Sequence, residues 1–362
     1  MRCELSDICV YRNERISTNA LNSHTYVSTE NMLPDKGGIT DAASLPTVSQ
    51  TSKFRYGDTL VSNIRPYFKK IWFAEYDGGC SNDVLVFSAK EGVDPKYLYY
   101  VLANDSFFAY STATSKGTKM PRGDKTSIMQ YQIEKVDSPT QKKIAAILSA
   151  LDEKIAINRA INDNLQQQVS ALYQSWFKNF EPSNGICPEH WSYQELSTIA
   201  NIVSGKRPPI KSEVCNQETS IPIVGAASIM GFTSQSNHTD KILVTGRVGT
   251  HGVVQRFNIP CWTSDNTLVI TSPFYEFTNQ ILCRIDYSLM NRGSTQPLIT
   301  QGDMKKVIVL IPDEKTLVKF EEFAGSLMAK WKANNHENIQ LALLRDSLLP
   351  KLMFGEIDVS VV

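Results

Sequence analysis

The sequence predicts an α+β protein in which two homologous β-rich globular domains are joined by two long antiparallel coiled-coil helices with pseudo-two-fold symmetry. Three observations predict this architecture. The 362-residue chain repeats itself after about 180 residues, each repeat opens with short apolar runs, and each repeat closes with one long helical segment. This length accommodates two domains of ordinary size plus connectors.

The repeat is visible as matched blocks at a nearly constant displacement. Leu60-Val61-Ser62 recurs 183 positions later as Leu243-Val244-Thr245, and Leu85-Val86 recurs at the same displacement as Leu268-Val269. Further matches are Ile71 with Val254, Ser81 with Ser264, Glu4-Leu5-Ser6 with Glu195-Leu196-Ser197, and Lys116-Gly117-Thr118 with Arg292-Gly293-Ser294. Self-similarity of this kind indicates two copies of one structural unit.

Each copy begins with segments typical of buried strands. In the first copy these are Thr59 to Ser62 and Asp83 to Phe87, with Asp77-Gly78-Gly79 as a turn between strands. Pro95 to Leu102 is predicted to form a short helix against them.

Each copy ends in a long helix, from about Gln141 to Phe177 and from about Asp313 to Leu349. Alternating steps of four and three give a coiled-coil seam in both helices. The first seam is Ile144, Leu148, Leu151, Ile155, Asn158, Asn162, Leu165, Val169, Leu172 and Trp176. The second, displaced by 176, is Phe320, Ala324, Leu327, Trp331, Asn334, Asn338, Leu341, Arg345, Leu348 and Leu352. Pro350 should end or kink the second helix.

Four asparagines interrupt the seams at matching positions. In an antiparallel pair, Asn158 faces Asn338 and Asn162 faces Asn334. Because buried asparagines fix coiled-coil register at some cost in stability, we interpret these four as register residues. Trp176 and Trp331 occupy seam positions and are expected to pack in the core.

The predicted boundaries follow from these elements. Residues 1–137 form the first β-rich domain, 138–180 the first helix, 181–189 a linker, 190–312 the second β-rich domain, 313–354 the second helix and 355–362 a C-terminal tail.

Composition narrows the class of protein. The 37 basic and 37 acidic residues cancel, so the chain lacks the bulk positive charge of many nucleic-acid-binding proteins. Its seven cysteines and five histidines are scattered without zinc-site spacing, which predicts reduced thiols and no metal site. The first residues lack the apolar run of a signal peptide and no apolar stretch is long enough to span a membrane, so we expect a cytoplasmic protein.

The order of the predicted elements and several short sequence blocks resemble those of the specificity subunits of type I restriction-modification systems. Tyr26 to Met32 and Gly57 to Ser62 look like the opening blocks of a target-recognition domain. Gln141 to Leu148 and Leu172 to Phe177 look like the family's central shared region, and Leu344 to Leu352 looks like the closing one. The resemblance covers nearly the whole chain.

The resemblance implies a division of labour among subunits. The two recognition domains would read a split, asymmetric site on double-stranded DNA, and the helices would hold them apart. Two adenine-N6 methyltransferase subunits would dock on the helices, and motor-nuclease subunits would join them. Adenosylmethionine, ATP and magnesium would therefore be bound by partners, and this chain would bind no cofactor.

The candidate DNA contacts lie in polar, basic loops, above all the loop from Ser111 to Lys125. Arg and Lys suit guanine edges and phosphates, and Gln suits adenine. In the first half the candidates are Arg65, Lys69, Lys70, Lys116, Lys119, Arg122 and Lys125. In the second half they are Lys206, Arg207, Arg247, His251, Arg292, Ser294 and Gln296.

No catalytic residues are predicted. Pro312-Asp313-Glu314-Lys315 superficially resembles a nuclease motif, but it opens a helix, where acidic residues are favoured by the helix dipole. Ser204-Gly205-Lys206-Arg207 lacks the spacing of a phosphate-binding loop. The alternative function is a self-sufficient nuclease or methyltransferase with an unrecognised site. A third reading, a purely structural coiled-coil adaptor, would leave the two β-rich domains without a role.

Overall fold

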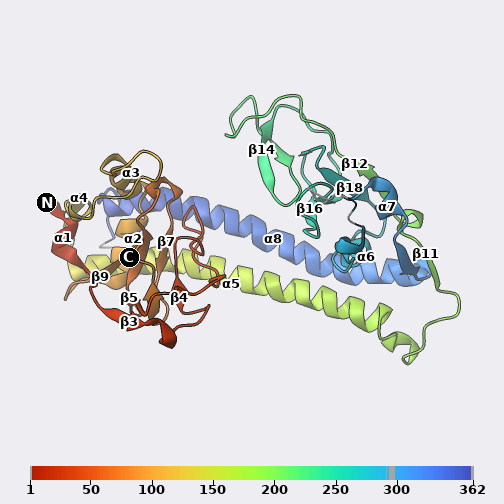
Figure 1. Ribbon diagram of the computed structural model, residues 1–362, viewed down its shortest axis with the longest axis horizontal. Helices are drawn as coiled ribbons and strands as arrows, with labels where there is room; N and C mark the ends of the chain where they lie inside the picture. Colours follow the sequence, from red (N-terminus) through yellow and green to blue (C-terminus); the bar gives the residue numbers. More distant parts are fainter. Residues whose placement is uncertain (1, 291, 293–297, 360–362) are drawn as a thin grey trace. The chain divides into compact units, whose positions relative to one another are not determined.

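The computed structural model describes residues 2–290, 292 and 298–359 (Figure 1). The chain divides into two compact units, Met1–Asn158 with His336–Val362 and Arg159–Asn335. Each unit combines one β-rich half with one part of each long helix. The two β-rich halves and the two long helices agree with the predicted α+β fold.

The first half holds two four-stranded sheets and a two-stranded ribbon. One sheet has the order β2-β9-β6-β7 and comprises Cys9–Tyr11, Val84–Ala89, Thr59–Ser62 and Ile71–Phe73. The other has the order β3-β5-β8-β4 and comprises Arg15–Ser17, Gln50–Phe54, Gly78–Cys80 and Tyr26–Val27. The ribbon pairs β1 (Arg2–Glu4) with β10 (Gln132–Glu134). Helices α1 to α4 are Leu5–Ile8, Pro95–Ala103, Asp105–Ala113 and Lys125–Met129.

The second half repeats this plan. Its four-stranded sheet has the order β12-β18-β15-β16, which is Asn201–Ser204, Thr267–Thr271, Ile242–Gly246 and Gln255–Phe257. A three-stranded sheet has the order β14-β13-β17, which is Ile229–Thr233, Ile221–Val224 and Trp262–Thr263. The ribbon pairs β11 (Ser192–Glu195) with β19 (Ile308–Ile311). Helices α6 and α7 are Tyr275–Leu282 and Gln301–Lys305.

Equivalent hydrogen bonds confirm the duplication. The Leu5 N–H donates to the Tyr131 carbonyl at 2.8 Å, and the Leu196 N–H donates to the Val307 carbonyl at the same distance. The next residue in each copy is a serine whose hydroxyl donates to the preceding glutamate. The two halves therefore fold by the same local rules.

The alignment of one block was wrong by one residue. Leu60 packs in the cluster that contains Phe54, whereas Leu243 packs in the cluster that contains Phe320. Strand pairing makes Leu60 equivalent to Val244, because Leu60 faces Val86 in one sheet and Val244 faces Val269 in the other. A one-residue slip moves a side chain to the opposite face of a sheet.

The predicted turn at Asp77-Gly78-Gly79 was also wrong, because both glycines belong to strand β8. A Cβ added to Gly78 would lie 2.4 Å from the Thr25 carbonyl oxygen and 2.5 Å from Phe54 Cζ. Glycine is used here for close approach of a strand to its neighbours, not for a bend.

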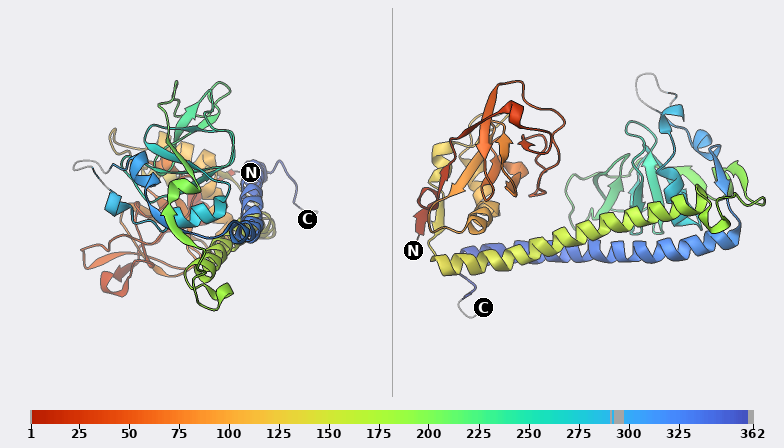
Figure 2. Two further views of the ribbon diagram at one scale, coloured as in Figure 1. Left: turned by 90° about the vertical axis from the view of Figure 1, so that its right-hand side faces the viewer. Right: turned by 90° about the horizontal axis from the view of Figure 1, so that it is seen from below.

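Local chemistry fixes where the short helices begin. Asp94 accepts hydrogen bonds from the Lys96 and Tyr97 amides at the start of α2, and Pro95 occupies the first turn, which is where proline is favoured. Buried α2 side chains such as Leu98 then pack with Val61 and Leu85 of the sheet and Leu148 of the long helix. Figure 2 shows this half on one side of the parts of the two long helices that belong to the same unit.

The long helices are α5 (Ser138–Phe177) and α8 (Glu314–Met353). Asp313 caps α8 by accepting from the Thr316 amide at 3.0 Å. Burial opposes the charge on Asp313, but hydrogen bonds from Thr316, Trp191 and His190 outweigh it and hold the pKa of Asp313 well below its usual range. The acidic residues therefore mark a helix start, as predicted.

Pro350 was predicted to end or kink the second helix, and it does not end it, since α8 continues to Met353. Proline lacks a backbone amide hydrogen and its ring clashes with the preceding turn of a helix. In the last turn of α8 these two effects do not prevent three further helical residues from following. The chain leaves the helix at Gly355, whose φ of +70° is the left-handed conformation that favours glycine.

The two helices pair antiparallel within each unit. In the first, Asp152 bonds Arg345 and Asn158 bonds Asn338; in the second, Asn162 bonds Asn334 and Phe177 packs on Phe320. Most seam side chains are buried or half-buried as predicted, and Trp176 and Trp331 pack against the apolar core.

Arg345, the charged exception in the second seam, is explained by its partners. Its guanidinium donates to Asp152 at 2.7 Å, and the other Asp152 oxygen accepts from the Tyr100 hydroxyl of α2, also at 2.7 Å. This group of three residues, the α2 clamp, ties the first β-rich half to both long helices.

Candidate nucleic-acid interface

The predicted DNA-contact loop of the first half is a closed hairpin. Its ends belong to helices, since Ser111 lies in α3 and Lys125 begins α4. Between them, the Lys116 and Arg122 backbones exchange two hydrogen bonds of 2.8 and 2.9 Å. Gly117 adopts a φ of +95°, which lets the chain reverse.

The hairpin is anchored to the segment that follows the central strand β6. The Arg65 amide donates to the Pro121 carbonyl at 2.8 Å, and the Gly123 amide donates to the Asn63 carbonyl at 3.1 Å. The structure therefore brings Arg65 together with Arg122 and the hairpin, although they are far apart in the sequence.

The second half has the same arrangement after its central strand β15. The Ile299 amide donates to the Arg247 carbonyl at 2.9 Å, and the Arg292 amide donates to the Leu298 carbonyl at 3.0 Å. His251 Nε2 lies 3.2 Å from that Arg247 carbonyl oxygen. The candidates Ser294 and Gln296 lie outside the described residues.

Several predicted cations are neutralised by carboxylates. Lys116 pairs with Asp124, Arg292 pairs with Asp303, Arg122 lies 3.0 Å from Asp83, and Lys69 lies 3.0 Å from Asp105. Hydrogen bonds from the Lys116 side chain and from the Ser127 amide lower the pKa of Asp124 to about 2. Exposed ion pairs of this kind contribute little to the stability of a protein, so a DNA phosphate can replace the carboxylate as partner at a small cost in free energy.

The remaining candidates differ in availability. Lys119, Lys125 and Arg207 are exposed, and within the described ranges no carboxylate pairs with them. Lys206 is exposed as well, and its backbone is fixed to Thr263. Lys70 Nζ donates to the Thr29 carbonyl at 2.6 Å, and burial lowers the pKa of this lysine. Lys70 is therefore the least suited to meet a ligand.

Sequence reasoning missed Asn63, which is the residue equivalent to Arg247. Asn63 Oδ1, Arg65 Nε and Arg247 Nε are buried, and among the described residues they have no hydrogen-bond partner. A buried polar atom left unpaired costs about 1–3 kcal/mol. No sequence pattern marked Asn63, because it has no charge and no local repeat of its type.

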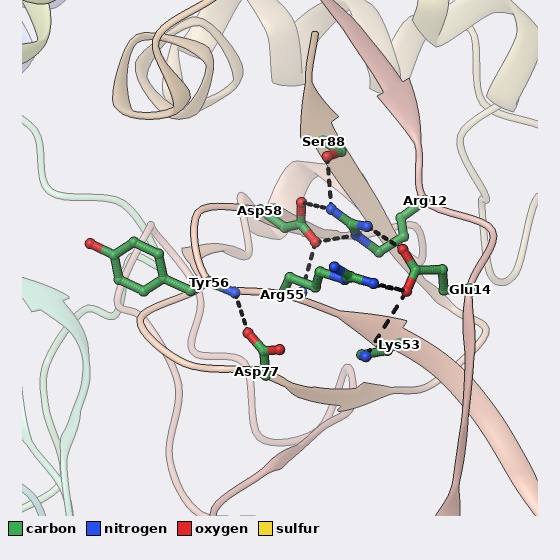
Figure 3. A network of polar contacts seen from close by, with 8 residues as sticks. All are labelled: Arg12, Glu14, Lys53, Arg55, Tyr56, Asp58, Asp77 and Ser88. Carbon is green, nitrogen blue, oxygen red and sulfur yellow. Dashed lines mark hydrogen bonds and ion pairs between the residues drawn. The ribbon is translucent and has the colours of Figure 1, made fainter. Parts of the chain in front are cut away.

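A second missed feature is a charged network between the two sheets of the first half (Figure 3). Arg12 donates to both carboxylate oxygens of Asp58 at 2.5 and 2.9 Å, and to Glu14 at 2.5 Å. Arg55 donates to Glu14 at 2.7 Å. The Asp58 side chain is only 3% exposed, so this bidentate pair is shielded from solvent.

We expect Asp58→Asn to lower the free energy of unfolding of the first half by about 2 kcal/mol, because Arg12 loses its charged partner in a buried place. Asp77→Asn is the matched control, since Asp77 is exposed and the Tyr56 amide, at 2.8 Å, is its one hydrogen-bond donor among the described residues, which asparagine can accept equally well. Urea unfolding measures both. Equal losses in the two variants would contradict a special role for the Arg12–Asp58 pair.

We also searched the described parts of the chain for metal sites, disulfides and membrane-spanning helices. No group of three His, Cys, Asp or Glu residues there is placed to hold a metal ion. The seven cysteines are free thiols, and burial raises the pKa of Cys9 and Cys80 to about 12. None of the described helices is both long and apolar enough to cross a membrane.

Residues 2–167, which include the first hairpin and most of α5, match the family described as type I restriction modification DNA specificity domain. This part of the chain belongs to the type I specificity-domain family. The second half carries a four-stranded sheet of the same order, and its Arg292 and Ile299 amides make the hydrogen bonds equivalent to those that anchor the first hairpin.

Full-length relatives agree with this assignment. The MjaIX specificity subunit of Methanocaldococcus jannaschii is 26% identical over 75% of this chain and 71% of its own length. The HindI specificity subunit of Haemophilus influenzae is 21% identical over 98% of both chains. The crystal structure of the type I S subunit from M. genitalium covers 99% of this chain and 96% of its own, with a TM-score of 0.58 and 18% identity, and shows the same fold.

Proposed function

We propose that this chain is the DNA sequence-recognition and assembly subunit of a type I restriction-modification complex, and that each half reads one part of a bipartite, asymmetric DNA site. The observation that carries the proposal is that each half has cation-bearing loop residues hydrogen-bonded to the segment that follows its central strand, β6 in the first half and β15 in the second. Arginine and lysine on such loops suit phosphates and guanine edges.

The two half-sites should differ in sequence. The equivalent positions hold Asn63 in one half and Arg247 in the other, and Lys116 in one half and Arg292 in the other. Asparagine suits adenine and arginine suits guanine in the major groove. Homologous folds with different side chains at equivalent positions of the loop and of its anchor favour an asymmetric site. The loop candidates named above remain proposed DNA contacts.

The assembly role would use the outer faces of the long helices. In the first unit, Ile157, Ile339 and Leu343 are more than half exposed, and in the second unit Phe323 is 56% exposed. Exposed large apolar side chains that recur along a helix favour a protein-binding surface. We propose two adenine-N6 methyltransferase subunits as the occupants, joined by motor-nuclease subunits.

Catalysis and cofactors would belong to those partners. The chain has no Asp/Asn-Pro-Pro-Tyr/Phe stretch of the kind adenine methyltransferases use and no phosphate-loop spacing. We therefore propose that adenosylmethionine, ATP and magnesium bind the partner subunits.

Reconstitution tests the proposal. The purified chain alone should neither methylate nor cleave DNA, because it carries no recognised catalytic motif. Addition of its methyltransferase partner should produce N6-methyladenine within one split sequence, detected by methylation-sensitive sequencing. Methylation or cleavage by the chain alone, after rigorous removal of contaminants, would support the self-sufficient enzyme and overturn the subunit proposal.

A further inference from the structure

A polar cavity of about 260 Å³ opens in the first half, beside the network of Figure 3. It lies where strands β2, β3 and β9 approach the start of α4. Besides Arg12 and Glu14 of that network, six polar side chains line it from these elements and their connections: Tyr11, Asn13, Arg15, Ser52, Asn82 and Lys125. Of these residues, only Lys125 was among the DNA contacts predicted from the sequence.

Two cations in the lining keep their charge unopposed. Arg15 Nη1 donates to Asn82 Oδ1 at 2.9 Å and to Ser52 Oγ at 3.2 Å, and both acceptors are neutral. Lys125 is exposed, and its ammonium has no ion-pair partner among the residues that the structure describes. These hydrogen bonds orient the guanidinium in advance, which lowers the entropy lost on binding an anion.

The acidic residue in the lining is already neutralised. Glu14 is bonded by Arg12 at 2.5 Å and Arg55 at 2.7 Å, and Lys53 Nζ lies 4.0 Å away. The hydrogen bond from Arg55 contributes most to holding the pKa of Glu14 below its usual value. Since Asp58 is also bonded to Arg12, the network sets three cations against two carboxylates and leaves the cavity positive.

The cavity adjoins the candidate DNA interface. Lys125 ends the predicted contact loop, and the Tyr11 hydroxyl fixes its backbone by donating to the Lys125 carbonyl at 3.0 Å. On the other side, Asn82 precedes Asp83, the partner of the loop residue Arg122. A ligand in the cavity would therefore be continuous with one held by the loop.

We propose that this cavity binds one phosphate group of the DNA backbone, with Arg15 and Lys125 as the charged contacts and Asn82 as the residue that positions Arg15. The inference rests on the proposed DNA-reading function. Arginine offers a planar fork that matches phosphate oxygens, and lysine adds a point charge. A phosphate contact fixes the register of a protein on DNA without selecting bases.

The test uses the full chain assembled with its partner subunits, and compares Arg15→Gln, Lys125→Gln and the double variant. Each additional phosphate contact makes log K fall more steeply with log salt, by about 0.9. The double variant should therefore lose about 0.9 from the salt slope and should bind the recognised motif and a scrambled duplex more weakly by the same factor. Lys135→Gln, an exposed lysine outside the cavity, is the charge-matched control for each single variant and should leave the slope unchanged.

Modified DNA identifies the source of the phosphate. In a scan of single methylphosphonate linkages, one position should weaken binding of the wild-type complex and should cost the double variant nothing further. Binding of inorganic phosphate by the wild type, with DNA binding intact in the double variant, would overturn the assignment to DNA. A loss confined to the recognised motif would indicate base reading and would overturn it too.

Folding and function are separated by two readouts. Both side chains are exposed, so the melting temperature of the double variant should equal that of the wild type. If the wild-type complex shows no sequence preference, the proposed function fails. If it does, and the double variant keeps the wild-type salt slope, only the phosphate site fails.

Discussion

Exchange of residues 1–137 for the recognition domain of another type I specificity subunit should change one half of the recognised DNA motif and leave the other half unchanged. The affinity for the old motif should fall by a factor of about 10³ or more, because specific binding exceeds non-specific binding by at least that much. Each half has its own anchored loop and its own apolar clusters, so the exchange replaces one reading surface completely.

The incoming domain must keep its attachment to the helices. The α2 clamp joins Tyr100 to Asp152 and Asp152 to Arg345, with both contacts at 2.7 Å. A domain that lacks a tyrosine at this position would leave a half-buried ion pair without its third member. The donor should therefore be chosen, or mutated, to carry tyrosine there.

The matched control is exchange of residues 190–312, which should change the other half of the motif. Methylome sequencing of cells that express each chimera with the partner subunits measures both results. A change in both halves of the motif after a single exchange would refute independent reading by the two domains.

Strong local or periodic signals in the sequence predicted the corresponding parts of the fold. The Thr59 to Ser62 strand was placed at its observed ends, and the two seams placed Asn158 opposite Asn338. The face of that strand was not predictable, because all four of its residues are buried and no alternation of polar and apolar residues marks the sides.

Polar contacts between residues far apart in the chain also could not be predicted from the sequence. Arg12 and Asp58 are 46 positions apart, and Arg15 and Asn82 are 67 positions apart. Neither pair has a spacing that local rules recognise, so only the folded chain brings them together. The carboxylates opposite Lys116 and Arg292 were missed for a related reason, because their roles as helix-capping residues conceal their second role as ion-pair partners.

The asparagine layer gives the second large expected effect. Asn158 and Asn162 are 1% and 4% exposed, and Asn334 is 1% exposed, so these amides replace apolar side chains in the helix pair. Asn158 donates to Asn338 at 3.0 Å, and Asn334 donates to Asn162 at 2.9 Å. The pairs are those that the antiparallel seam predicts, and their role in fixing register remains a prediction.

Additional partners reduce the gain that leucine can supply. Asn158 also donates to Glu337 at 2.7 Å, and Asn162 donates to Asn335 at 3.0 Å. Complete burial of a leucine contributes about 1.5–3 kcal/mol, and each lost hydrogen bond removes about 0.5–1.5 kcal/mol. Replacement of all four asparagines by leucine should therefore raise the free energy of unfolding by about 4 kcal/mol.

The same variant should read DNA less strictly. Without the polar layer, the seam is apolar almost throughout and one helix can slip past the other by a heptad, about 10 Å at ~1.5 Å per residue. The complex should then accept sites whose two halves are separated by altered numbers of base pairs, measured by binding to a series of spacer lengths. Gln167→Leu with Gln340→Leu, at exposed positions of the same helices, is the control and should change neither stability nor spacing. An unchanged spacing preference in the quadruple variant would show that the asparagines do not set the register.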